Sequence, residues 1–245
     1  MTKKNNFKGA IFDMDGVITQ TATIHAKAWK AMLDDFLKGQ QGEGFEPFDI
    51  EKDYKQYIDG KPRLDGIRSF LESRSISLEE GAPEDHETDT IQGLGKRKND
   101  FFMKLLEEEG VQAFPDALDL IKKWKGAVKL AVISASKNCE YIMKAAGALE
   151  YFEVKVDGIV SEEQQLKGKP QPDIFLDASE QLGLDPSQCI VFEDAIAGVV
   201  AGKKGGFGLV IGVARNGGER DLINHGADFV VSSLNNVEQK IQEHA

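Results

Sequence analysis

Six short apolar runs, rich in β-branched residues, recur along this chain of 245 residues and constrain its fold more than any other feature. The runs are continuous and do not alternate with polar residues, which is typical of strands covered on both faces, as in a parallel sheet. They cover residues 9–12, 128–134, 156–160, 189–193, 208–213 and 228–231. We therefore expect an α/β protein built on a doubly wound parallel sheet.

Helical patterns lie between most of these runs. Leu118, Ile121 and Trp124 recur every three residues, with Pro115 suited to a helix start and Gly126 to its end. The same plan of an apolar stripe closed by glycine occurs at 137–147, 172–183 and 194–206. The second half of the chain therefore predicts a β-α-β-α order.

One interval breaks this rhythm, because no convincing buried strand occurs between Phe12 and Val128. The interval is too long for a single crossover connection, so we expect an inserted helical domain. Three apolar helix faces are visible in it, formed by Ile24, Ala28, Met32 and Phe36, by Leu64, Ile67 and Leu71, and by Phe101, Phe102, Leu105 and Leu106. Residues 39–47 and 78–89 are polar and rich in turn formers, which predicts loops.

Composition excludes several classes of partner. Acidic residues number 41 and basic residues 30, so the formal net charge of −11 disfavours nucleic acid and anionic membranes. No apolar run approaches the roughly 20 residues of a membrane span, and the polar start "MTKKNN" is no signal segment, so we expect a cytoplasmic protein. No heptad pattern indicates a coiled-coil dimer, and we expect a monomer. Cys139 and Cys189 lack the spacing of a zinc site.

Chemically reactive residues follow the predicted strands at their carboxyl ends, where ligands bind to open parallel sheets. Asp13 and Asp15 end the first run, Ser134 and Ser136 the second, and Glu193 and Asp194 the fourth, and Lys169 lies in a loop before a helix. A carboxylate can attack phosphorus once a divalent cation and a lysine neutralise the repulsion between them. The pattern predicts phosphoryl transfer through an aspartyl phosphate.

The expected roles follow from this chemistry. Asp13 and Asp194, with Glu193 beside them, would ligate Mg²⁺, which prefers oxygen ligands. Lys169 and Ser134 would hold the transferring phosphoryl group, and Asp15 would act as general acid and base.

Each motif taken alone has a plainer explanation. "DMDG" is also a common acidic turn, the "ED" pair at 193–194 suits the first turn of a helix, and Ser136 or Asn138 could be a helix N-cap. A single lysine such as Lys169 is usually solvated. The joint occurrence of the motifs, in order and at strand ends, favours the catalytic interpretation.

The ordered motifs "DMDGVIT", "VISAS", "KGKPQPD" and "VFEDAIAG" resemble those of the haloacid dehalogenase superfamily of phosphotransferases, over residues 7 to about 231. Within it, "DMDGVITQTATIHAKAW", "SASKN" and "KPQPDIF" are most similar to the β-phosphoglucomutases. That resemblance implies a catalytic core of residues 1–20 and 111–245, a helical cap of residues 21–110, Mg²⁺ as cofactor and a sugar phosphate as substrate. It also implies interconversion of β-glucose 1-phosphate and glucose 6-phosphate.

Further residue roles come only from this resemblance. Asp15 would also ligate the metal through its backbone carbonyl, and Thr21 and His25 would couple cap closure to the position of Asp15. Arg63 would meet the phosphate that is not transferred, together with the loop residues Ala135, Ser136, Lys137 and Asn138. Alternatively, Arg63 forms a surface ion pair with Asp59 or Asp65, and His25 is a half-buried helical residue beside Trp29.

Two other functions stay open. A phosphatase would use the same motifs, with water in place of a sugar hydroxyl as acceptor. A non-catalytic sugar-phosphate sensor would have lost a key residue, and none is missing. Gln20 and Ala195 depart from the usual pattern of the β-phosphoglucomutases, which affects the expected substrate more than the expected chemistry.

Overall fold

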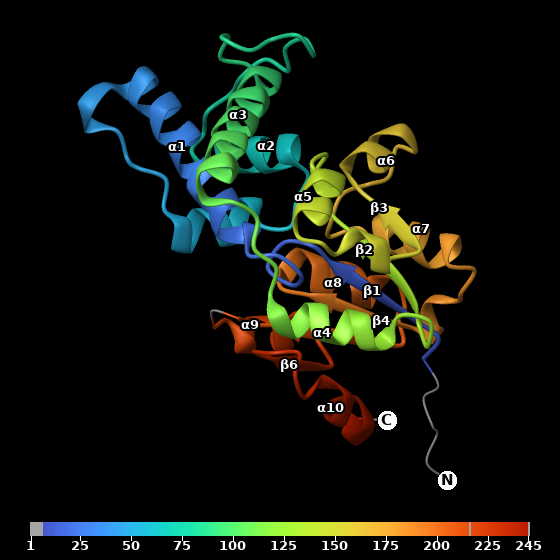
Figure 1. Cartoon of the computed structure of the whole chain (residues 1–245). Coiled ribbons are helices and arrows are strands. Elements are labelled where there is room, and N and C mark those ends of the chain that lie inside the picture. The colour runs from blue at the N-terminus through green and yellow to red at the C-terminus, as the bar shows by residue number, and fades with distance from the viewer. Residues whose placement is uncertain (1–6, 216, 245) are drawn as a thin grey trace. The chain divides into compact units, whose positions relative to one another are not determined.

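The computed structural model describes residues 7–215 and 217–244 and contains two compact units (Figure 1). The chain up to Gln20 and from Gln112 onward forms the first, here called the core unit. Residues Thr21–Val111 form the second, here called the helical unit.

The core unit contains a six-stranded sheet in the order β3-β2-β1-β4-β5-β6, with every neighbouring pair parallel. The strands are β1 (Gly9–Asp13), β2 (Lys129–Ile133), β3 (Val154–Val156), β4 (Cys189–Glu193), β5 (Leu209–Val213) and β6 (Phe229–Val231). The strands β1 and β4 are the central pair, with β2 and β3 on the side of β1 and β5 and β6 on the side of β4. The strand order therefore reverses between β1 and β4, and their carboxyl ends lie side by side at this topological switch point. This arrangement confirms the predicted doubly wound α/β fold.

Helices cover both faces of this sheet. They are α4 (Pro115–Trp124), α5 (Cys139–Ala145), α6 (Gly158–Glu163), α7 (Asp173–Gln181), α8 (Ile196–Lys204), α9 (Glu219–Asn224) and α10 (Val237–His244). Short 3₁₀ turns occur at Leu149–Tyr151 and Pro186–Gln188.

The two faces of β1 pack against different partners, because successive side chains of a strand point in opposite directions. Ile11 joins a buried cluster that includes Phe175 of α7 and Val199 of α8. Phe12 points the other way, where its ring stacks on that of Phe192 at 4.4 Å between centroids and meets the edge of Trp124 of α4. Burial on both faces explains why the strands read as unbroken apolar runs.

One predicted strand boundary is wrong. The sequence pattern predicts a strand over 156–160, whereas β3 ends at Val156 and Gly158 begins α6. The cause is Asp157, whose buried carboxylate accepts hydrogen bonds from the backbone amides of Ile159 and Val160 and so caps the helix.

The helical unit consists of α1 (Thr21–Gln41), a 3₁₀ turn (Gly42–Gly44), the π-helix η2 (Ile50–Ile58), α2 (Arg63–Ser73) and α3 (Ile91–Glu109). Its core is a buried cluster of Trp29, Met32, Phe36, Phe48, Phe70 and Leu94, among others. The predicted helix faces lie in α1, α2 and α3, and no helix or strand interrupts the described residues 78–89, which confirms that loop.

The predicted loop over 39–47 is partly wrong, because α1 continues to Gln41 before the 3₁₀ turn begins. The helix η2 was not predicted either, although Ile50, Tyr54 and Ile58 recur at helical spacing. Its N-terminus is stabilised by Asp49, whose side chain accepts from the amides of Glu51 and Lys52.

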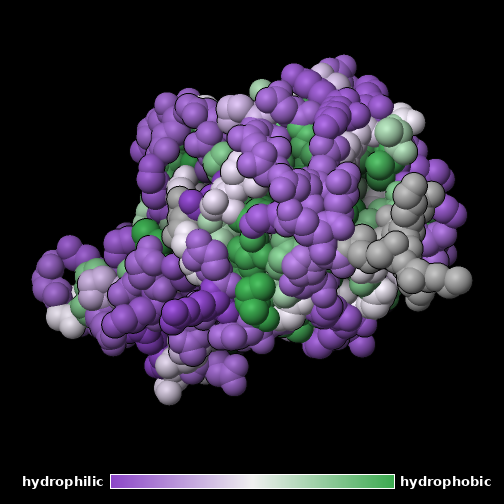
Figure 2. Space-filling model, turned by 90° about the horizontal axis from the view of Figure 1, so that it is seen from below, coloured by the Kyte–Doolittle hydropathy of each residue, from purple (hydrophilic) through white to green (hydrophobic). Residues whose placement is uncertain are grey.

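The surface is largely hydrophilic. Hydrophilic residues cover most of the face in Figure 2, with a narrow strip of hydrophobic residues between them. The large exposed hydrophobic residues of the described chain, Tyr141, Ile159, Leu176 and Ile223, lie singly on four different helices. Within that same part of the chain, no helix is both long enough and apolar enough to cross a membrane.

Candidate active site

The candidate site lies at the carboxyl edge of the sheet in the core unit. Asp13 is the last residue of β1, Ser134 follows β2, and Glu193 is the last residue of β4. Parallel pairing of β1 with both β2 and β4 places these three ends next to one another. Lys169 reaches the same place from the loop before α7, where the peptide between Lys169 and Pro170 is cis.

A buried ion-pair cluster forms the centre of this site. Lys169 Nζ lies 2.6 Å from Asp13 Oδ1 and 3.0 Å from Glu193 Oε2. All three side chains are almost completely buried. The structure thus overturns the plainer interpretation of Lys169 as a solvated lysine.

The charges in this cluster shift one another's pKa values. Burial alone would lower the pKa of Lys169, but the carboxylates of Asp13 and Glu193 outweigh burial and raise it. Burial raises the pKa of Asp13, Lys169 opposes that effect, and the charge of Asp15 reinforces it. The lysine therefore stays charged, and a further cation would also hold Asp13 ionised.

Three carboxylates are grouped where such a cation would bind. Oxygens of Asp13, Glu193 and Asp194 all lie within 4.8 Å of one another. Three carboxylates this close together repel one another, and a divalent cation with oxygen ligands would neutralise that repulsion. The donor set therefore fits a hard divalent metal ion.

Two glycines that the sequence analysis did not single out shape this acidic group. Gly16 has φ of +79°, and a Cβ atom there would lie 1.8 Å from Asp194 Oδ2. A Cβ atom on Gly198 would lie 2.0 Å from Cδ of Glu193. Both glycines let backbone approach a carboxylate closely. The Asp-Gly turn at 15–16 was a signal for the first of them, whereas Gly198 lies within a helix and gave none.

The substitution Gly16→Ala is expected to weaken the binding of Mg²⁺ to the core unit by at least about tenfold, because the new methyl group displaces the carboxylate of Asp194. It should also lower the free energy of unfolding by about 1–2 kcal/mol through backbone strain. Isothermal titration calorimetry with Mg²⁺ and thermal unfolding measure the two effects.

Gly126→Ala is the matched control, since Gly126 has φ of +81° and a Cβ atom added there would meet no atom within 4 Å. It should lose comparable stability with unchanged Mg²⁺ affinity. Equal Mg²⁺ affinities of the two variants would show that Gly16 does not support the metal site.

The loop after β2 is ordered by its own serines. Ser134 Oγ donates to Asp15 Oδ2 at 3.3 Å and accepts from the amide of Ser136 at 3.0 Å. Ser136 Oγ in turn accepts from the amide of Asn138 at 3.1 Å. Asn138 occupies the N-cap position of α5, but its side chain makes no capping hydrogen bond, so simple capping does not explain this asparagine.

The remaining loop residues lie further out. Lys137 is exposed and pairs with Glu162 at 2.6 Å, and Ala135 is half-buried. Gly158 packs beneath them, because a Cβ atom there would lie 2.7 Å from the carbonyl oxygen of Ala135. The backbone of this loop is therefore closely supported from α6.

Arg63 begins α2 in the helical unit. Its guanidinium donates to the carbonyl of Gly95 and to Asn99 Oδ1, both at 3.0 Å. These contacts replace the predicted alternative of an ion pair with Asp59 or Asp65. Burial lowers the pKa of Arg63, with partial opposition from Asp100, and the side chain remains half-buried.

His25 and Thr21 lie on α1 of the helical unit. The His25 ring stacks on Phe102 at 4.0 Å between centroids, and its Nδ1 lies 2.6 Å from Lys98 Nζ. Lys98 is 3% exposed and lies over the rings of Trp29 and Phe102. No sequence pattern distinguishes Lys98 from the surface lysines nearby, so its burial was not predictable. Thr21 is fully buried.

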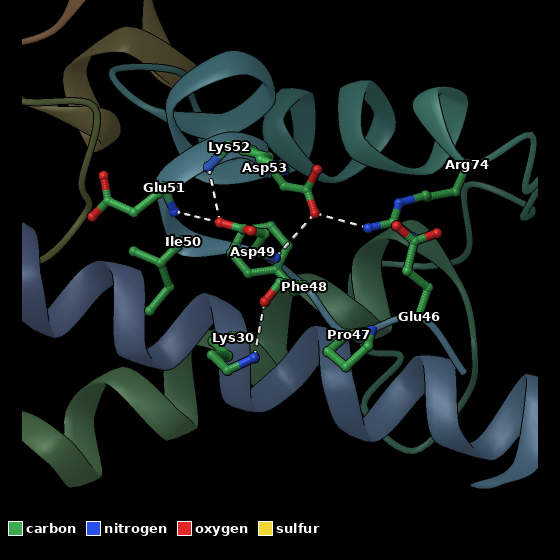
Figure 3. A pocket seen from close by; sticks show the side chains of 10 residues that line it. All are labelled: Lys30, Glu46, Pro47, Phe48, Asp49, Ile50, Glu51, Lys52, Asp53 and Arg74. Atoms are coloured by element: carbon green, nitrogen blue, oxygen red, sulfur yellow. Dashed lines mark hydrogen bonds and ion pairs between the residues drawn. The ribbon is translucent and has the colours of Figure 1, made fainter. Parts of the chain in front are cut away.

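A separate pocket of about 590 Å³ in the helical unit is lined by none of the predicted site residues. Several of its charged groups are already paired with one another or with neighbouring groups (Figure 3). Arg74 pairs with Asp53 and Glu46, both at 2.8 Å, and Lys30 donates to the carbonyl of Phe48. Arg74 and Lys30 already bind groups of the protein, so this pocket is not a ready site for an anionic ligand. We therefore place the candidate site at the sheet edge.

Comparison with known proteins identifies the family of this chain. A family model described as haloacid dehalogenase-like hydrolase matches residues 7–206. A β-phosphoglucomutase of Mycobacterium bovis is 43% identical over 93% of this chain and 90% of its own length. A fructose-1-phosphate phosphatase of Escherichia coli is 29% identical over 83% of this chain and 95% of its own length.

Among solved structures, a β-phosphoglucomutase from Clostridium difficile matches with a TM-score of 0.76 and 26% identity, covering 97% of this chain and 96% of that one. The family model spans every core motif from Asp13 to Asp194, including Lys169. The chain belongs to the haloacid dehalogenase-like hydrolase family.

Proposed function

We propose that this protein is a cytoplasmic, monomeric β-phosphoglucomutase that converts β-glucose 1-phosphate to glucose 6-phosphate with Mg²⁺ as cofactor. The observation that carries the proposal is the buried cluster in which Lys169 pairs with Asp13 beside Glu193 and Asp194. The relative from Mycobacterium bovis, at 43% identity, supports the choice of substrate. The partner is thus a small sugar phosphate, with no role for nucleic acid or membrane.

Asp13 is the nucleophile in this proposal. Its carboxylate oxygen forms a bond to phosphorus of a bisphosphorylated glucose, the bond from phosphorus to the sugar oxygen breaks, and an aspartyl phosphate results. Lys169, fixed at 2.6 Å from Asp13, lowers the repulsion between the two anions, and the Ser134 hydroxyl contacts the transferring oxygens. Bound Mg²⁺, ligated by Asp13, Glu193, Asp194 and the Asp15 carbonyl, would neutralise further charge.

Asp15 moves the proton. It protonates the departing sugar oxygen in the first step and then accepts the proton of the sugar hydroxyl that attacks the aspartyl phosphate. The carboxyl group of Asp15 is half-buried and accepts a hydrogen bond from the Ser134 hydroxyl. This hydrogen bond helps to keep the Asp15 carboxyl group near Asp13. Water entering at the second step would give free phosphate.

The phosphate that is not transferred would be held by Arg63 together with the loop residues Ala135, Ser136, Lys137 and Asn138. A guanidinium binds phosphate oxygens in pairs, and binding energy from a remote phosphate can drive closure around the reacting one. Thr21 and His25, at the start of α1, would link that closure to the position of Asp15.

A phosphatase is the second candidate, favoured by the Escherichia coli fructose-1-phosphate phosphatase relative. The two functions share every core residue and differ in the acceptor. A non-catalytic sugar-phosphate sensor remains the weakest candidate, because the described structure retains all of the core residues at the sheet edge.

The deciding experiment is ³¹P NMR of the protein with Mg²⁺, β-glucose 1-phosphate and a trace of bisphosphorylated glucose. We expect the signal of glucose 6-phosphate to grow with little free phosphate. Release of free phosphate alone would replace the mutase with the phosphatase, and absence of any turnover across a panel of phosphomonoesters would favour the sensor.

Arg63→Ala should lower mutase kcat/KM by about 100-fold, because the remote phosphate loses its guanidinium contact. Arg68→Ala is the matched control on the same helix, since Arg68 is exposed and pairs only with Asp65 and Glu80 in the described contacts. It should stay within about twofold of wild type by the small effect expected of surface ion pairs. Equal losses in both variants would remove Arg63 from the substrate site.

A further inference from the structure

A buried arginine in the core unit has no role in the proposed chemistry. Arg215 follows β5, and its side chain is one tenth exposed. Its Nη2 donates to the carbonyl of Val17 at 3.0 Å, and its Nη1 donates to Asp116 Oδ2 at 2.8 Å. The guanidinium carbon lies 3.8 Å from the centre of the Phe114 ring. An arginine with this many fixed contacts holds a defined position.

The carbonyl that Arg215 contacts belongs to the turn carrying Asp15. Residues 14–19 fold back on themselves, since the amides of Ile18 and Thr19 donate to the Met14 carbonyl and the amide of Gly16 donates to the Thr19 carbonyl. Phe114 donates its amide to the Ile18 carbonyl at 2.8 Å. Arg215 and Phe114 thus hold two adjacent carbonyls on the outer side of this turn.

Asp116 keeps the arginine in place. Besides Arg215, its Oδ2 accepts from Ser233 Oγ and from the amide of Leu234, both at 2.7 Å. Burial would raise the pKa of Asp116, yet these hydrogen bonds and the charge of Arg215 lower it to about 2. The carboxylate therefore remains ionised at neutral pH and joins α4, the loop after β6 and Arg215.

We infer that Arg215, held by Asp116 and stacked on Phe114, is a positioning residue that fixes the turn of residues 14–19 and with it the carboxyl group of Asp15. The inference rests on the proposed function, in which Asp15 serves two different sugar oxygens. A proton carrier that is displaced slightly loses rate and leaves substrate affinity nearly unchanged. The two contacts are made by separate guanidinium nitrogens, which a lysine cannot reproduce.

The main test is Arg215→Met, which keeps an unbranched stem and removes the guanidinium together with both of its hydrogen bonds. We expect kcat to fall about 30- to 100-fold while KM stays within about threefold, as for a misplaced catalytic group. Guanidinium ion at millimolar concentration should restore at least about fivefold of the lost kcat by occupying the vacated place. Arg215→Lys should retain an intermediate kcat.

Lys203→Met is the matched control, because it also replaces a cation paired with an aspartate, Asp228, by methionine in the core unit, at a more exposed place. Its kcat should equal that of wild type with or without guanidinium. Amide hydrogen exchange supplies a second readout: in Arg215→Met the amides of Gly16, Ile18 and Thr19 should exchange about tenfold faster, while the amides of β4 keep their protection.

A wild-type kcat in Arg215→Met would overturn the inference. A second pattern would also overturn it: a loss of kcat that guanidinium does not restore, together with equally faster amide exchange in every strand. That pattern indicates a general loss of stability. If Arg215→Met fails to fold, Arg215→Lys and Asp116→Asn carry the same kcat and exchange measurements. If wild type transfers no phosphoryl group, the proposed function fails, and the exchange pattern alone decides whether Arg215 holds the turn.

Discussion

Replacement of Asp13 by asparagine is expected to abolish phosphoryl transfer, with a loss in kcat of at least about 10⁴-fold, because an amide oxygen is not a nucleophile toward phosphorus. The substitution also removes one of three grouped carboxylates and the nearest partner of Lys169. Incubation with ³²P-labelled bisphosphorylated glucose should label wild type on an acid-stable, base-labile acyl phosphate and leave Asp13→Asn unlabelled.

Asp119→Asn is the control for this substitution, since Asp119 is an exposed residue of α4 in the same unit. It should keep both the labelling and the kcat of wild type. Labelling of Asp13→Asn at the wild-type level would assign the nucleophile to another residue and refute the proposed mechanism.

The second large effect is expected from Lys169→Met. Loss of the ammonium leaves the buried carboxylates of Asp13 and Glu193 without their shared cation, so the pKa of Asp13, already raised by burial, should rise further. In metal-free buffer the free energy of unfolding should fall by about 3–5 kcal/mol, as for a buried ion pair that loses one partner. The kcat should fall by about 10³-fold, because the transferring phosphoryl group loses its fixed positive charge.

The effect of Mg²⁺ on Lys169→Met distinguishes a loss of positive charge from general damage to the fold. With Lys169 absent, the three carboxylates carry more uncompensated charge, so Lys169→Met should bind Mg²⁺ more tightly than wild type and recover stability as Mg²⁺ is added. Lys123→Met, which removes an exposed lysine paired with Glu238, should change neither quantity measurably. Weaker Mg²⁺ binding by Lys169→Met would contradict the arrangement of charges described above.

The sheet was predictable because its signal is local. A strand covered on both faces needs apolar residues at every position, and five of the six predicted runs coincide with observed strands to within two residues. The sixth failed at Asp157, where a single side chain caps a helix and outweighs the apolar character of Ile159 and Val160. The π-helix η2 was missed although Ile50, Tyr54 and Ile58 recur every four residues and pack in or against the core of the helical unit, because this stripe is short and lies among charged residues.

The core of the candidate site was also predictable, because parallel strands bring their carboxyl ends together. Sequence order alone therefore placed Asp13, Ser134 and Glu193 at one edge. It did not reveal that Gly198 leaves room for the Glu193 side chain, because that requires knowing which helix face meets the strand end. Lys98 and Arg215 were missed because only tertiary contacts distinguish them from surface cations.

The sequence by itself determined the α/β class, the interruption after the first strand and the identity of the acids at the sheet edge, since each depends on short-range periodicity or on motif order. Only the tertiary structure decided that Lys169 pairs with Asp13, 156 positions away in the chain, and that Arg215 supports the turn of Asp15. Such pairings depend on side-chain reach, burial and the charges that surround each group. Those quantities exist only once the chain has folded.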